Sequence, residues 1–131
     1  MKVMVVDDEM VSRKKLAKIL EDLGVCHDFE SGDAALISFE KALKEGQTYH
    51  LVTLDISMPN IDGLEVLNHL RQIEDVYNVP EAKRAKIIMV TSRNERDSIL
   101  SAISERCTDY IVKPFNRAEI FDRLSKNGII P

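Results

Sequence analysis

The chain has 131 residues and a mass of 14.9 kDa, which predicts a single domain over 1–131. Its residues are 44% hydrophobic and 31% charged, a composition that excludes a disordered protein. The formal net charge is −4 and there is no basic stripe, so we expect no direct binding to nucleic acid. No apolar run approaches the ~20 residues that cross a bilayer. Since the N-terminus also lacks the long apolar region of a signal peptide, we expect a cytoplasmic protein without membrane contact.

The cysteines and histidines do not form a metal-binding or redox motif. Cys26 and Cys107 are far apart in the sequence, so we expect two small buried residues in a reducing compartment and not a disulfide or zinc site. His27, His50 and His69 form no metal-binding pattern, and we interpret them as structural or surface residues.

Short apolar runs alternate with amphipathic stretches along the whole chain. The apolar runs predict strands at 3–6, 25–29, 51–54, 87–90 and 110–112. The amphipathic stretches predict helices over 10–23, from 31–33 to about 45, from Gly63 onward, over 97–105 and after Asn116. Gly24 is placed to end the first helix, and we expect 74–85 to be a polar loop. This order predicts a doubly wound α/β fold in which a parallel sheet is covered on both faces.

Ligands of such sheets bind at the carboxyl ends of the strands, so the residues that follow each apolar run are the candidate site. They are Asp7 and Asp8, Asp55, Thr91, and Lys113. Carboxylates ~4 Å apart repel by ~4 kcal/mol per pair at an effective dielectric constant of ~20. They therefore stay ionised only beside a cation, and an all-oxygen ligand set suits Mg²⁺ or Mn²⁺. A hydroxyl and an ammonium at the same edge predict phosphoryl transfer to an aspartate.

Four segments extend this pattern: VVDDE at 5–9, DISMPNIDG at 55–63, VTS at 90–92 and DYIVKPF at 109–115. In this order the chain resembles the response regulator receiver domain of two-component signalling, over essentially its full length. The resemblance implies a flavodoxin-like sheet of five parallel strands in the order 2-1-3-4-5.

The resemblance also implies a role for each acid. Asp55 corresponds to the residue that accepts the phosphoryl group and also contacts the metal. Asp8 corresponds to a direct Mg²⁺ (or Mn²⁺) ligand, and Asp7 to a residue that acts through a metal-bound water. Ser57 corresponds to the residue that offers its backbone carbonyl to the metal.

The remaining matched residues correspond to the family's signalling machinery. Thr91 is implied to move toward the phosphoryl group, with Lys113 as its cationic partner and Tyr110 as the aromatic switch. The Lys113–Pro114 bond is expected to be cis.

The implied partners are proteins. A sensor histidine kinase or a phosphotransfer protein would donate the phosphoryl group, and a downstream target would bind the chain as a monomer or weak dimer. The surface expected to change comprises the helix over 97–105, the strand 110–112 and the last helix, and carries Arg96, Arg117, Arg123 and Lys126. No effector domain is expected within 1–131.

Two features depart from the family pattern. The 74–85 stretch lengthens the path from Asp55 to Thr91, and we interpret it as a surface insertion, with an elongated helix or a recognition loop as alternatives. Many relatives carry Gly-Ala before the last strand, where this chain has Arg106-Cys107.

A phosphatase with an aspartate nucleophile is the alternative function. Such enzymes carry a DxD motif after the first strand, whereas here the candidate nucleophile follows the third strand and Ser57 occupies the position of the second acid. A nucleotide-binding protein is a third possibility, but neither Gly-rich phosphate-binding motif occurs in the sequence.

Overall fold

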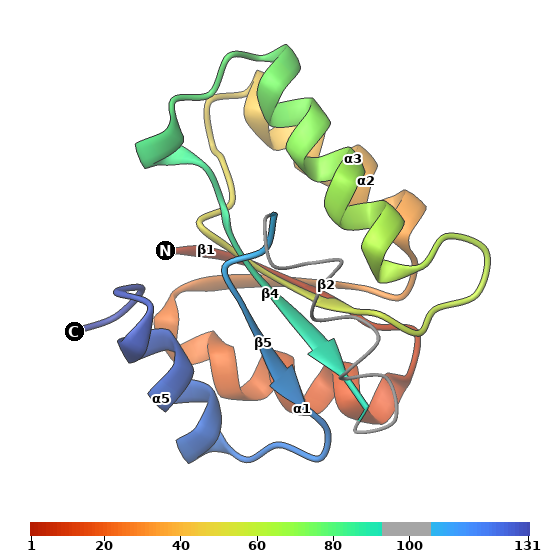
Figure 1. The fold of residues 1–131 in the computed structure, drawn as a ribbon, viewed down its shortest axis with the longest axis vertical. Coiled ribbons are helices and arrows are strands. Elements are labelled where there is room, and N and C mark those ends of the chain that lie inside the picture. Colours follow the sequence, from red (N-terminus) through yellow and green to blue (C-terminus); the bar gives the residue numbers. More distant parts are fainter. Residues whose placement is uncertain (93–105) are drawn as a thin grey trace.

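The computed structural model describes residues 1–92 and 106–131, and its centre is a five-stranded parallel sheet (Figure 1). The strand order is β2-β1-β3-β4-β5, as the resemblance implies. The strands are β1 Lys2–Val6, β2 Val25–Phe29, β3 Leu51–Asp55, β4 Lys86–Thr91 and β5 Asp109–Val112. The helices are α1 Met10–Leu20, α2 Gly32–Lys44, α3 Gly63–Val76 and α5 Arg117–Lys126, with 3-10 turns at Glu21–Leu23 and Glu81–Lys83.

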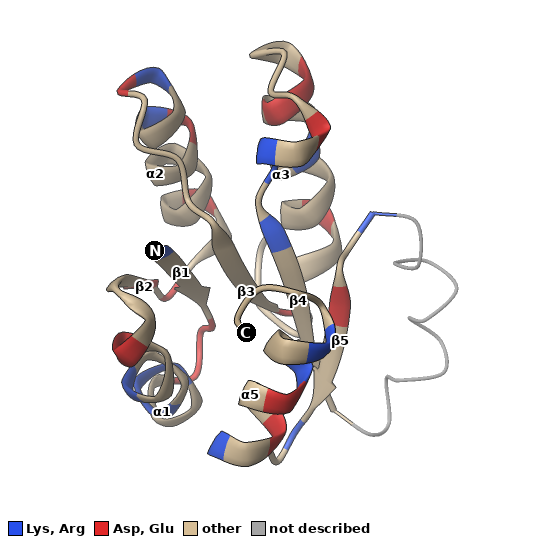
Figure 2. Cartoon of the chain, turned by 90° about the vertical axis from the view of Figure 1, so that its left-hand side faces the viewer, with Lys and Arg blue, Asp and Glu red and all other residues tan. Residues whose placement is uncertain are grey.

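The sheet has two apolar faces because successive side chains of a strand point to opposite sides. Helices α2 and α3 cover one face, and α1 and α5 cover the other (Figure 2). Met4 and Val52 belong to the core below α2 and α3, whereas their neighbours Val3 and Leu51 belong to the core below α1 and α5. Both faces are buried along β1, β3 and β4, which explains why these central strands are apolar at nearly every position.

Side-chain caps begin three of the four α-helices that the structure describes. The Asp62 carboxylate accepts the N–H of Glu65 in α3, at 2.9 Å. The Ser31 hydroxyl accepts the N–H of Ala34 in α2, at 3.2 Å. The Asn116 side chain accepts the N–H of Glu119 at 2.8 Å, which confirms the capping predicted for the last helix.

Helix α1 is shorter than predicted. We expected a helix over 10–23, but it ends at Leu20 and continues as the 3-10 turn. The physical reason lies at Gly24, where a Cβ would come within 2.1 Å of the Met1 carbonyl oxygen. The tighter turn brings the chain against the N-terminus, where Val25 N–H donates to that same oxygen at 3.0 Å.

The prediction of a polar loop over 74–85 is wrong at its start, and a short 3-10 turn lies inside the stretch. Helix α3 continues through Val76, and Glu81–Lys83 forms a 3-10 turn. Glu74 is 1% exposed, because Arg71 and the Ala85 N–H satisfy its carboxylate. An acid that reads as loop surface in the sequence is therefore part of the interior.

Other predictions are confirmed only in part or fall outside the described residues. Cys26 and Cys107 are free thiols. We expected both to be fully buried, but the structure shows both half-buried. The helix expected over 97–105, and with it Arg96, lies outside the described residues. Within the described ranges, no helix has the length and apolarity needed to cross a membrane.

Candidate functional site

Three carboxylates meet at the carboxyl edge of the sheet. Strands β1 and β3 are hydrogen-bonded neighbours with Val6 opposite Leu54, so Asp7 and Asp55 emerge side by side. One carboxylate oxygen each from Asp7, Asp8 and Asp55 lies within 4.8 Å of the others. Asp7 and Asp55 are buried and Asp8 is exposed, so the cluster is open to solvent on one side.

Lys113 brings a positive charge to this cluster from the end of β5. Its Nζ donates to Oδ2 of Asp7 at 3.2 Å and to Oδ2 of Asp55 at 3.5 Å. The Lys113 backbone N–H donates to the Thr91 carbonyl at 2.7 Å, and the Lys113–Pro114 bond is cis as expected. Lys113 therefore lies beside the acids, at the sheet edge where the sequence predicts it.

The electrostatics of the cluster leave Asp55 short of compensating charge. Burial, followed by the charge of Asp7, raises the pKa of Asp55 to about 7, against a lowering effect of Lys113. Burial disfavours the Lys113 ammonium, but the carboxylates of Asp55 and Asp7 outweigh burial and raise the pKa of Lys113. One ammonium thus faces two buried carboxylates and an exposed third. These oxygen donors and this excess of negative charge fit Mg²⁺ or Mn²⁺.

The other predicted site residues surround the acids in different states of burial. Ser57 is exposed two positions after Asp55, and its backbone hydrogen bond lowers the pKa of that carboxyl. Thr91 is 2% exposed at the end of β4, and its hydroxyl donates to the Ser92 carbonyl at 3.1 Å. That hydroxyl is directed along its own chain and not into the cluster.

Tyr110 lies on the edge strand β5. Its ring is half-buried against the core below α2 and α3, and the guanidinium of Arg123 lies 5.4 Å from the ring centroid. Tyr110 therefore connects the sheet edge with α5.

Gly63 is required by the path of the loop after Asp55. A Cβ at this position would lie 2.3 Å from the Asp55 carbonyl oxygen and 2.8 Å from the Ile56 Cα. The Gly63 N–H also donates to the Ile56 carbonyl at 3.0 Å. The first residue of α3 thus packs directly on the backbone that carries the candidate acceptor.

Arg13 is a site residue that the sequence analysis missed. Its Nη1 donates to the Asp7 carbonyl at 3.0 Å, and its Nε pairs with Asp28 Oδ2 at 3.0 Å. Arg13 is 8% exposed and stands three and seven residues before Leu16 and Leu20, on the buried face of α1. The signal in the sequence was the position of Arg13 on the apolar face of a helix. A guanidinium buried at such a position needs fixed hydrogen-bond partners, which marks Arg13 as a structural contact of the site.

Comparisons with known proteins agree with this geometry. The family model "Response regulator receiver domain" matches residues 3–125. The chain is 30% identical over 126 residues to chemotaxis protein CheY-3 of Vibrio cholerae, covering 96% of this chain and 90% of that protein. It is 35% identical over 124 residues to the transcriptional regulatory protein ResD of Bacillus subtilis, covering 94% of this chain and 46% of ResD.

Solved structures show the same fold. A CheY-like receiver domain protein from Methanospirillum hungatei superimposes with a TM-score of 0.72 at 28% identity, over 98% of this chain and 94% of that one. The BeF3-activated receiver domain of DrrB gives a TM-score of 0.72 at 26% identity, over 98% of this chain and 97% of that one. The fold and the acidic edge thus define a receiver domain of two-component signalling. The chain belongs to the response regulator receiver family, whose general property is a phosphorylation-dependent switch and not the turnover of a classical enzyme.

Proposed function

We propose that this chain is a signalling switch that accepts a phosphoryl group on Asp55 and reports it to a partner protein. The observation that carries the proposal is the convergence of Asp7, Asp8 and Asp55 within 4.8 Å, with Lys113 Nζ on two of them. An Asp55 oxygen attacks the phosphorus of a phosphohistidine on a sensor kinase or phosphotransfer protein. The phosphorus–nitrogen bond breaks, and the donor imidazole keeps the electron pair.

The residues that would hold Mg²⁺ are Asp8, Asp55 and the Ser57 carbonyl, with Asp7 acting through a water. When bound, the ion would offset the negative charge of the acids and of the transferring phosphoryl oxygens. Lys113 already lies 3.5 Å from Asp55 Oδ2 and is placed to contact those oxygens as well. Arg13 would stabilise the backbone at Asp7, because its guanidinium donates to the Asp7 carbonyl.

The conformational change caused by phosphorylation would pass from the site through Thr91. Its hydroxyl donates to Ser92 in this structure, so it must rotate or shift to contact a phosphoryl group on Asp55. The expected changes then reach Tyr110 and, through Arg123, helix α5. A complete population shift needs ~5.5 kcal/mol of differential stabilisation, so Thr91, Lys113 and the metal must act together.

The test of the acceptor is labelling with acetyl phosphate and Mg²⁺, followed by intact-mass measurement. Asp55→Asn should remove the added phosphoryl mass while the fold persists. Asp62→Asn is the matched control, because Asp62 lies in the same loop and caps α3, and asparagine caps equally well. Undiminished labelling of Asp55→Asn would disprove the assignment.

The test of the switch is the amide NMR spectrum with beryllofluoride and Mg²⁺. We expect shifts at Asp55 and across β5 and α5 in the wild type. Thr91→Ala should keep acetyl phosphate labelling and lose the β5 and α5 shifts. Shifts confined to the Asp55 loop in the wild type would contradict the proposed route.

A further inference from the structure

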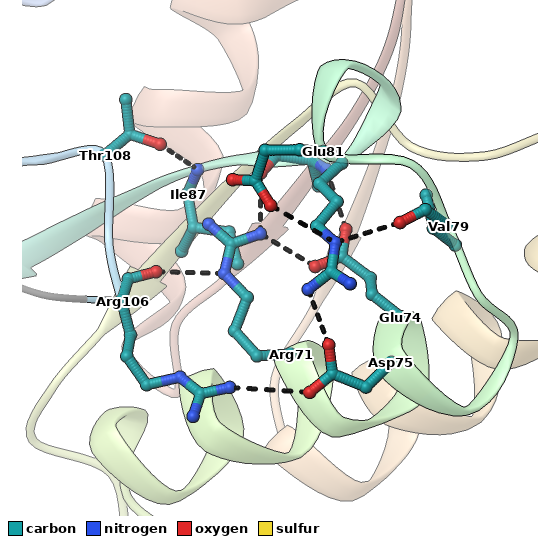
Figure 3. Close-up of polar contacts among 10 residues, drawn as sticks. Arg71, Glu74, Asp75, Val79, Glu81, Ile87, Arg106 and Thr108 are labelled. Atoms are coloured by element: carbon teal, nitrogen blue, oxygen red, sulfur yellow. Dashed lines mark hydrogen bonds and ion pairs between the residues drawn. The ribbon is translucent and has the colours of Figure 1, made fainter.

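A polar cavity lies at the amino edge of the sheet, opposite the edge that carries Asp55. It has a volume of about 550 Å³ and is bordered by the amino end of β4 and by the residues just before β5 (Figure 3). The six residues of β4 separate this edge from Thr91 by ~17 Å, at ~3.3 Å per residue. The cavity is therefore distinct from the phosphorylation site.

Both departures from the family pattern meet in this cavity. The 74–85 stretch contributes Glu81 and Arg84, and the Arg106-Cys107 pair supplies two further lining residues. Arg71 of α3 lies between them, and its Nε donates to the Arg106 carbonyl at 2.9 Å (Figure 3). Two sequence features that the switch does not use thus build one site.

The lining carries more positive than negative charge. Four cations, Arg71, Arg84, Lys86 and Arg106, face one lining acid, Glu81, whose side chain is 95% exposed. Cys107 contributes no negative charge, because burial raises the pKa of its thiol. Glu74 and Asp75 lie outside the lining and pair with its arginines, so four cations meet three acids and the local excess is one positive charge in a chain of net charge −4.

Two of the guanidinium groups are fixed in place by acids outside the lining and by backbone carbonyls. Arg71 Nη1 bonds Glu74 Oε1 at 2.8 Å and the Ala85 carbonyl at 2.9 Å. Arg84 Nη1 pairs with Asp75 Oδ1 at 2.7 Å. Across residues 1–92 and 106–131, Nη2 of both arginines and Nζ of Lys86 have no hydrogen-bond or ion-pair partner. As far as the described residues go, these donors are available to a ligand, and the two guanidinium groups are already oriented.

We propose that this cavity binds a small anion that carries at least two phosphoryl oxygens, the chemistry shared by nucleotides and sugar phosphates. Planar guanidinium groups with free N–H donors match phosphate oxygens, and Lys86 adds a compact ammonium. The cavity volume lies within the range of about 300–1,000 Å³ that small-molecule sites occupy, and its concave form favours a small ligand over a peptide. The proposal is independent of phosphorylation at Asp55.

The test is a titration of the ¹⁵N-labelled chain with inorganic pyrophosphate, without Mg²⁺ and at constant ionic strength. We expect saturable amide shifts concentrated at 81–86 and 106–108. Lys86→Gln and Arg106→Gln should each weaken binding about tenfold, as for the loss of one charge-assisted hydrogen bond. Both side chains are exposed, so these variants should keep the wild-type circular dichroism spectrum.

Lys83→Gln is the matched control. Lys83 is exposed in the 3-10 turn Glu81–Lys83, next to the lining residue Arg84, but does not itself line the cavity. The variant therefore loses one charge near the cavity and should bind pyrophosphate as the wild type does. Equal weakening by Lys83→Gln would show a diffuse charge effect and overturn the site. Shifts confined to the Asp55 edge, or no saturable shift at about 10 mM pyrophosphate, would overturn it as well.

Discussion

The burial of Asp55 predicts that the protein loses stability as the pH rises toward neutrality. The pKa of Asp55 is raised from 3.8 to about 7 in the folded chain, chiefly by burial and then by Asp7. A raised carboxyl pKa contributes stability that is complete below the unfolded value and is lost as the pH passes the folded value. A difference of about three pH units corresponds to about 4 kcal/mol of unfolding free energy. Asp55→Asn has no charge to desolvate and should not show this loss.

The assay is urea unfolding, followed by circular dichroism, in metal-free buffers from about pH 4 to about pH 8. The free energy of unfolding of the wild type should fall by up to about 4 kcal/mol, whereas Asp55→Asn should stay nearly level over the same range. Adding Mg²⁺ at the high end should restore stability to the wild type by mass action. Glu30→Gln, at an exposed acid between β2 and α2, is the control and should follow the wild type. Parallel curves for wild type and Asp55→Asn would refute the reasoning.

Three further substitutions probe the contacts around the site and the α3 extension. Lys113→Met removes the ammonium that lowers the pKa of Asp55, so an NMR titration of the Asp55 carboxyl should give a midpoint above the wild-type value of about 7. Gly63→Ala places a methyl group 2.3 Å from a backbone oxygen, and urea unfolding should show a loss of about 3 kcal/mol, because neither backbone can move away independently. Arg71→Met leaves the Glu74 carboxylate buried without its cation and should cost about 3–5 kcal/mol in the same assay.

Each of these has a matched control. Lys126→Met removes a lysine of α5, which pairs with Asp122, and should leave the Asp55 midpoint unchanged. Gly46→Ala should cost only ~1 kcal/mol, because its φ is +72° but nothing lies within 4 Å of the added Cβ. A loss at Gly63→Ala no larger than this would contradict the steric argument. Combining Arg71→Met with Glu74→Gln should recover much of the loss, and simple additivity would argue against a coupled buried pair.

The grouping of the acids and the lysine at one sheet edge could be predicted from the sequence because it depends on local patterns. Apolar runs that stop at Asp7, Asp55 and Thr91 mark strand ends, and the carboxyl ends of parallel strands share one edge. Lys113 followed from the same rule. A receiver-like arrangement could therefore be predicted from short segments without any knowledge of distant contacts.

Contacts between segments far apart in the chain could not be read in this way. Helix α3 passes Glu74 because Arg71 and the Ala85 N–H satisfy that buried acid, and Ala85 belongs to the next segment. The buried Arg13 needs Asp28, fifteen residues further along the chain, as its partner. Charged residue types such as those of Glu74 and Arg13 are normally surface residues, so their burial is not expected unless their distant partners are known.

The sequence by itself determined the strands, the parallel α/β architecture and the acids and lysine of the site, because burial on two faces and the shared edge of a sheet leave local signatures. Only the tertiary structure decided where α1 and α3 end, that Glu74 is interior, and that Arg71, Arg84, Lys86 and Arg106 surround one cavity. The physical reason is that a buried charge or a close backbone approach is stable only with its partner in place, and these partners are brought together by the fold.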